Sequence, residues 1–193
     1  MKINVNDRSY SVENRFDKFD EFWNQLVQEI AQKELIIAEV NIDGTVVYDN
    51  FYNFIKENMQ SATTVSIQII TRSEACQQLI KSVNIYLDNF PPYLEDLAND
   101  LYGNPTTATW NKFNQLLDGI EWVVNALNSL SKYLDNAAIY SLTDLRKGYV
   151  NLTASMLDAF NNKDYFQLGD LLQYDFIDKI EITQETLNKY YKM

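Results

Sequence analysis

The feature that most constrains the fold of this chain is a change of hydrophobic period near residue 72. Before that point, short runs alternate apolar with polar residues, as at Ile3 and Val5 and again over residues 65–70, and this is the period of β-strands. After it, apolar residues recur every three or four positions, which is the period of an amphipathic helix. We therefore expect a mixed α+β domain over residues 1–72 and a helical domain over residues 73–193.

The expected elements of residues 1–72 follow the order strand, strand, helix, strand, strand, short helix, strand. Apolar spacings of three and four place the first helix at about residues 16–33, and the last strand is expected at residues 65–70. This ββαββαβ order resembles the β-grasp, or ubiquitin-like, fold, and a split β-α-β sandwich shares much of it. The resemblance is one of topology and includes no diagnostic motif.

The segment Val-Asn-Ile-Asp-Gly-Thr-Val-Val at residues 40–47 raises the question of catalysis. It resembles the first motif of the haloacid-dehalogenase phosphatases, Asp-x-Asp-Gly-Thr, whose first Asp forms the phospho-enzyme and whose second acts as acid and base. Here the first position is Asn41, which lacks the anionic oxygen needed for nucleophilic attack. Asp43-Gly44 between two β-rich runs is instead typical of a type I′ turn, which needs positive φ at both central residues. We therefore expect a hairpin.

The few prolines and glycines of the helical domain indicate where its helices end. A first helix should begin at Ser73 and reach about Phe90, where Pro91-Pro92 must break or kink it. The further helices are expected at about residues 93–102, 107–134, 142–161 and 164–190, the last with a candidate break near residues 182–183. Short links between these helices predict an all-α up-and-down bundle. In residues 119–131 the only charge is Glu121, so we expect this stretch at the centre of the bundle.

The absence of histidine restricts the chemistry available to the chain. It excludes Ser-His-Asp and Cys-His arrangements, the Glu-x-x-His di-iron site and most zinc sites. Asp96 and Asp100 lie one helical turn apart and could attract Mg²⁺ or Ca²⁺, although acid pairs at this spacing are usually solvated helix faces. We therefore assign no catalytic residue, cofactor or metal ligand, and a carboxylate-based or divalent-metal-dependent enzyme stays the alternative.

The net charge indicates which partners the protein avoids, and the N-terminus and the single cysteine indicate its cellular compartment. A net charge of −11 repels nucleic acids and anionic membrane surfaces, so we expect neither as a partner. The N-terminus has no apolar signal region and no run of about 18 apolar residues occurs, so neither secretion nor membrane insertion is indicated. Because Cys76 is the single cysteine, the chain cannot form an internal disulfide, which fits a reducing, cytoplasmic compartment. We expect Cys76 to be buried as a small hydrophobic residue.

Aromatic residues flank the Pro91-Pro92 break, and acids lie on the same segment. Buried aromatic residues often anchor protein interfaces, and carboxylates around them favour a basic partner, although aromatic residues also commonly fill cores. The predicted partner-binding residues are Tyr86, Phe90, Tyr93, Asp96, Asp100, Tyr102 and Trp110.

These observations predict a non-catalytic cytoplasmic interaction protein, adaptor or chaperone-like, whose helical half binds a partner helix or peptide. The expected partner is a protein of basic or helical character. A self-assembling structural protein, whose bundle buries itself in a homodimer, is the other alternative.

Overall fold

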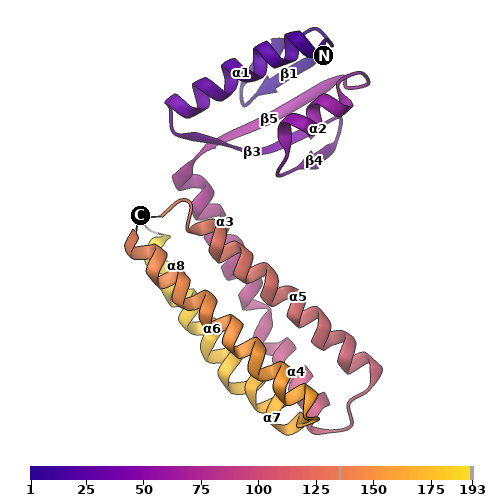
Figure 1. Cartoon of the computed structure of the whole chain (residues 1–193), viewed down its shortest axis with the longest axis vertical. Coiled ribbons are helices and arrows are strands. Elements are labelled where there is room, and N and C mark those ends of the chain that lie inside the picture. Colours follow the sequence, from indigo (N-terminus) through magenta and orange to yellow (C-terminus); the bar gives the residue numbers. More distant parts are fainter. Residues whose placement is uncertain (135, 192–193) are drawn as a thin grey trace. The chain divides into compact units, whose positions relative to one another are not determined.

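The computed structural model describes residues 1–134 and 136–191 and has the predicted α+β class, with a five-stranded sheet followed by helices (Figure 1). The chain divides into two compact units, Met1–Ala75 and Cys76–Met193, each of which is described by itself. The expected boundary between residues 72 and 73 falls in the first turn of helix α3 (Arg72–Asp88), which follows the last strand, β5 (Thr64–Thr71).

The sheet of the first unit has the strand order β2-β1-β5-β3-β4. Strands β1 and β5 are parallel, and the other neighbours are antiparallel. This is the arrangement of a β-grasp sheet, and the predicted β-grasp-like module is confirmed. The remaining elements of this unit are β1 (Lys2–Val5), β2 (Arg8–Ser11), α1 (Phe16–Gln32), β3 (Leu35–Ile42), β4 (Thr45–Val47) and α2 (Phe51–Asn58).

Helices α1 and α2 both contribute side chains to a core on one face of this sheet, for example Phe19 from α1 and Ile55 from α2. Strand β3 keeps its apolar side chains on that face through a bulge. Its register with β5 shifts between Ile37 and Glu39, so the extra residue Ala38 returns Val40 to the same face as Ile37.

The hairpin predicted at residues 43 and 44 is confirmed. Asp43 has φ 48° and Gly44 has φ 99°, and β3 and β4 pair on either side of them. The side-chain oxygen of Asn41 accepts the backbone N–H of Gly44 at 2.8 Å, so the residue at the motif's first position serves the turn.

The second unit is a bundle of four arms that run up, down, up and down (Figure 1). The first arm joins α3 to α4, the second and third are α5 and α6, and the fourth continues from α7 through a π-helix, η1, into α8. Their bounds are α4 (Phe90–Tyr102), α5 (Thr107–Leu130), α6 (Asn136–Asn161), α7 (Tyr165–Asp170), η1 (Leu171–Phe176) and α8 (Ile177–Tyr190).

Several helix ends differ from the expected positions. Helix α3 begins before Ser73, because Thr71 and Glu74 form a reciprocal capping pair, with Oγ1 of Thr71 accepting from the backbone of Glu74 at 3.1 Å. Helix α5 ends at Leu130 instead of near residue 134, since the chain tightens there into bonds spanning three residues. Helix α6 begins at Asn136 instead of residue 142, because the buried Ala138 extends its apolar face upstream.

Two irregularities also lie away from their expected positions. The first arm breaks at Asn89, and Pro91 and Pro92 lie in the first turn of α4, where a helix needs no backbone N–H donors. The last arm is irregular at η1 and not near residue 182, since α8 is continuous from Ile177 to Tyr190. Within α8 the Thr183 hydroxyl donates to the Lys179 carbonyl at 2.7 Å.

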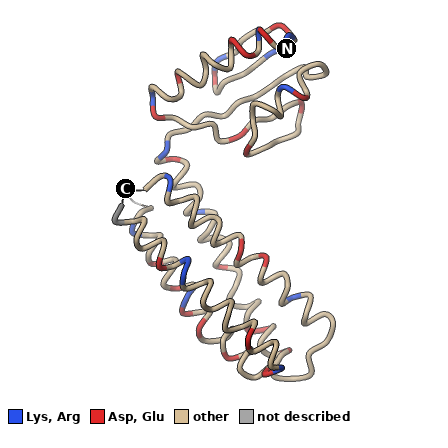
Figure 2. The backbone as a smooth tube through the Cα atoms, viewed as in Figure 1, with Lys and Arg blue, Asp and Glu red and all other residues tan. Residues whose placement is uncertain are grey.

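The expectation that residues 119–131 lie at the bundle centre is wrong. Helix α5 packs against α4 and α6, but its outward face is exposed and includes Trp122, which is 40% exposed. Uncharged polar residues such as Asn125 and Asn128 cover this face, so a low charge count does not indicate burial here. Figure 2 shows the acidic residues spread along the helices of this unit, with basic residues among them.

Candidate functional site

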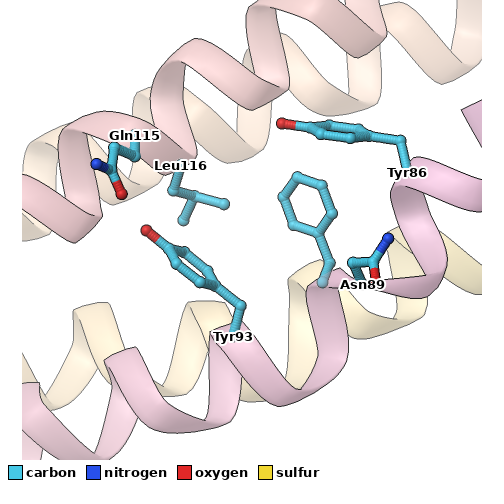
Figure 3. A pocket seen from close by; sticks show the side chains of 6 residues that line it. Tyr86, Asn89, Tyr93, Gln115 and Leu116 are labelled. Carbon is cyan, nitrogen blue, oxygen red and sulfur yellow. The ribbon is translucent and has the colours of Figure 1, made fainter.

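A pocket of about 190 Å³ lies where the first arm of the bundle breaks, against α5 (Figure 3). Helices α3 and α4 and the residue between them contribute Tyr86, Asn89, Phe90 and Tyr93, and α5 contributes Gln115 and Leu116. Three of the seven residues predicted to bind a partner, Tyr86, Phe90 and Tyr93, are therefore together in one concave site.

The break that opens this site has a local cause. Pro91 has no backbone N–H, so the carbonyl of Leu87 lacks its helical donor. Asn89 ends α3 by donating its side-chain amide to the Ile85 carbonyl at 2.7 Å and its backbone N–H to the Tyr86 carbonyl at 3.2 Å. The rings of Tyr86 and Tyr93, one on each side of the break, consequently flank Leu116 (Figure 3).

The ring of Tyr86 occupies its position because α5 has a glycine beneath it. A Cβ added to Gly119 would lie 2.4 Å from the Tyr86 hydroxyl oxygen and 3.2 Å from the ring of Phe90. On its other side Tyr86 packs edge-on against Trp122, with ring centroids 4.7 Å apart. Gly119 was not among the predicted site residues; its signal in the sequence is an isolated glycine inside a helical pattern.

The floor of the pocket belongs to the core. Phe90 is 6% exposed and stacks on Phe176 of η1 at 5.6 Å between ring centroids. Phe90 is thus a packing residue that presents one edge to the pocket. The hydroxyl of Tyr93 donates to the Lys112 carbonyl at 2.6 Å, which ties α4 to α5.

The tyrosine hydroxyls of the pocket are neutral hydrogen-bonding groups. Burial raises the pKa of Tyr86, and the carboxylate of Asp118 raises it further. Burial likewise raises the pKa of Tyr93, with Lys112 opposing and Asp96 adding to the shift. Both hydroxyls therefore stay protonated at neutral pH. The Tyr86 hydroxyl can donate to a bound group, whereas the Tyr93 hydroxyl already donates to Lys112 and can only accept a further hydrogen bond.

Asp96 and Asp100 share a helix face, and a lysine from α5 lies between them. The ammonium of Lys112 pairs with both carboxylates, at 3.0 Å from Asp100, and these two hydrogen bonds raise the pKa of Lys112. The ammonium of Lys112 thus occupies the position between Asp96 and Asp100 that a metal ion would take. Within residues 1–134 and 136–191, no group of three or more His, Cys, Asp or Glu side chains is arranged to hold a metal ion.

Tyr102 and Trp110 lie outside the pocket. The Tyr102 hydroxyl donates to the Asp170 carboxylate at 2.7 Å, and burial together with that carboxylate raises the pKa of Tyr102 to about 12. Trp110 packs against Phe160 and Tyr165 at 5.2 and 5.1 Å between ring centroids. Both residues contact side chains that are distant in the sequence. They therefore hold helices together and do not line the pocket.

A second, shallower groove of about 330 Å³ lies between α5 and α6, and sequence reasoning did not identify it. Its lining residues are Leu117, Ile120, Glu121, Val124, Val150 and Thr153. Val150 of α6, which lines this groove, is 59% exposed.

Two other expectations concern burial and membranes. Cys76 is buried, as predicted, and burial raises the pKa of its thiol. Across the described part of the chain, every helix is too short or too polar to cross a membrane.

Comparison with known proteins gives a family match for the helical unit. No curated protein and no solved structure has significant similarity to the chain. The family model described as "Domain of unknown function (DUF8042)" matches residues 78–186, which cover the pocket and all four arms of the bundle. Because this match spans more than half of the 193 residues, the chain belongs to the DUF8042 family of domains of unknown function.

Proposed function

We propose that this protein is a non-catalytic, cytoplasmic interaction protein, adaptor or chaperone-like, that binds a partner helix or peptide in the pocket beside Asn89. The observation that carries the proposal is the pocket itself, in which two tyrosine rings and Leu116 surround a largely apolar floor at a helix break. Anchor pockets in protein interfaces have this character, with aromatic walls and few polar groups.

The size of the pocket favours a protein partner over a small molecule. At about 190 Å³ it is smaller than the roughly 300–1,000 Å³ of typical small-molecule and cofactor sites. One large apolar side chain is the natural occupant, since interfaces concentrate their energy in a few such anchors.

The remaining predicted residues support the site indirectly. Asp96, whose side chain is 64% exposed, lies on the same helix as Tyr93 and can contribute to an acidic rim. Tyr102 and Trp110 hold α4 and the start of α5 in place through the contacts described above. The net charge of −11 supports a basic partner, and a single buried cysteine fits a reducing cytoplasm.

Site-specific photo-crosslinking in cells tests this proposal. A photoreactive residue at Gln115, which lines the pocket, should form an adduct with a defined partner. The same residue at Asn125, exposed on the same helix but outside the pocket, should not. Tyr93→Ala, shown to be folded by circular dichroism, should reduce the adduct at Gln115. Equal adduct yields at Gln115 and Asn125 would contradict the proposal.

Self-association is a second candidate function, and the groove between α5 and α6 favours it. Val150 and Val124 expose apolar surface there that a second copy could cover. Light scattering of the full chain decides between monomer and dimer, and Val150→Lys should abolish a dimer formed through this groove.

A further inference from the structure

We infer that the occupant of the pocket is an extended peptide segment with one apolar anchor side chain and a lysine or arginine close to it in sequence. This inference rests on the proposed function and names the chemistry of the partner.

The extended conformation follows from unpaired polar groups around the apolar floor. Within the described residues, the side-chain amide of Gln115, the side-chain oxygen of Asn89 and the hydroxyl of Tyr86 have no hydrogen-bond partner in the protein. Figure 3 shows Gln115 and Asn89 at the margins of the site and the Tyr86 hydroxyl directed toward α5.

These groups match the backbone of an extended chain better than that of a helix. A bound helix already satisfies its backbone N–H and C=O groups internally. It could therefore bond the polar groups around the pocket mainly through its side chains. An extended segment presents a free N–H and a free C=O at each residue, which amide side chains can bond while the anchor enters the pocket.

The basic residue follows from the carboxylates near both tyrosines. Asp118 is exposed, acts electrostatically on Tyr86 and has no ion-pair partner among the described residues. Near Tyr93, one ammonium, that of Lys112, is shared by two carboxylates, which leaves a net negative charge. A cationic side chain on either side of the anchor would therefore meet a carboxylate.

The same charges disfavour the other occupants. A second copy of the chain carries a net charge of −11, and an acidic peptide would place carboxylates against Asp118 and Asp96. Like charges brought together at an interface weaken binding.

Selection of short random linear peptides displayed on phage, with the full chain as bait, tests the inference. Enriched peptides should share one large apolar residue with a lysine or arginine nearby. Labelled synthetic versions, measured by fluorescence polarisation, should bind Asp118→Asn and Asp96→Asn several-fold more weakly, and Gln115→Ala more weakly as well. Asp158→Asn, a matched neutralisation on α6, which does not line the pocket, should leave the affinity unchanged.

Three results would overturn this inference. Enriched peptides without basic residues would exclude the charge requirement, and peptides that become helical on binding, seen by circular dichroism, would exclude the extended conformation. Failure to enrich any peptide sensitive to Gln115→Ala would exclude a short segment as the occupant. In each case an adduct specific to Gln115 in the crosslinking experiment would leave the proposed function standing, and its absence would remove both.

Discussion

At the residue scale, two glycines inside helices of the bundle have different neighbours. A Cβ at Gly119 would collide with the hydroxyl of Tyr86 and crowd the ring of Phe90, and the ring of Tyr86 is itself held by Phe90 and Trp122. A Cβ at Gly148 would meet the ammonium of Lys179 at 2.4 Å, which is the far end of a flexible chain. Close packing around Tyr86 therefore requires a glycine at position 119, whereas a small side chain in place of Gly148 can be accommodated.

Gly119→Ala should lower the free energy of unfolding by up to about 2 kcal/mol, because an overpacking cost of about 1–3 kcal/mol outweighs a gain in helix propensity of about 1 kcal/mol. Gly148→Ala should be neutral or stabilising, since Lys179 can move aside. Urea denaturation of both variants measures this. Tyr86→Phe combined with Gly119→Ala should recover part of the loss, and an unchanged urea midpoint for Gly119→Ala alone would contradict the contact.

Also at the residue scale, Asp43 joins its hairpin to the segment before β5. Its carboxylate accepts the backbone N–H groups of Thr63 and Thr64 at 2.8 Å each, and these two bonds lower the pKa of Asp43. A carboxyl whose folded pKa is depressed stabilises the fold above its ordinary pKa of about 3.9, and this contribution is lost as pH falls through the lowered folded value.

Asp43→Asn should therefore lower the urea midpoint at neutral pH, while the difference from the wild type should shrink as the pH falls below about 4. Asparagine tolerates the positive φ at this position, so the substitution tests the hydrogen bonds and not the turn conformation. A difference that is the same at neutral and acidic pH would show that the ionised carboxylate is not responsible.

At the element scale, a buried hydrogen bond between Tyr149 and Thr183 joins α6 to α8. Because the Thr183 hydroxyl donates to the Lys179 carbonyl at 2.7 Å, Tyr149 must be the donor in its 3.1 Å bond to Thr183. Tyr149 is fully buried and burial raises its pKa to about 12, so the neutral hydroxyl depends on this one acceptor.

Thr183→Val should destabilise the bundle by about 1–3 kcal/mol, since it leaves a buried hydroxyl without an acceptor. Thr183→Ser keeps the acceptor and should be less damaging. Adding Tyr149→Phe to Thr183→Val should restore part of the stability, and thermal unfolding of these variants and of Tyr149→Phe alone measures the coupling. Strictly additive losses in the double variant would mean that the two residues do not interact.

At the scale of the whole molecule, the division of the chain leads to a prediction about independent folding. The unit Cys76–Met193 has a core of its own formed by all four arms. A fragment of residues 73–193 should therefore be helical and unfold cooperatively, whereas residues 1–72 should be less stable because a smaller domain buries a smaller share of its surface. Circular dichroism of both fragments tests this, and an unfolded 73–193 fragment would mean that the units fold only together.

The β-grasp order, the hairpin and the helical half were all predictable from short-range features. Alternation at Ile3 and Val5, the turn preference of Asp43-Gly44 and the helical spacing after residue 72 each depend on neighbouring residues alone. Secondary structure and its order follow from such local preferences, and the α+β fold class of this protein follows from that order.

The pocket depended on tertiary packing. The sequence placed Tyr86 and Tyr93 near a helix break, but only the packing of the first arm on α5 brings Gly119 under Tyr86 and Lys112 between Asp96 and Asp100. It also directs Tyr102 and Trp110 into contacts with residues far along the chain. Helical periodicity defines which residues share a face, whereas the rotation and register of one helix against another come from side chains that meet only in the folded bundle.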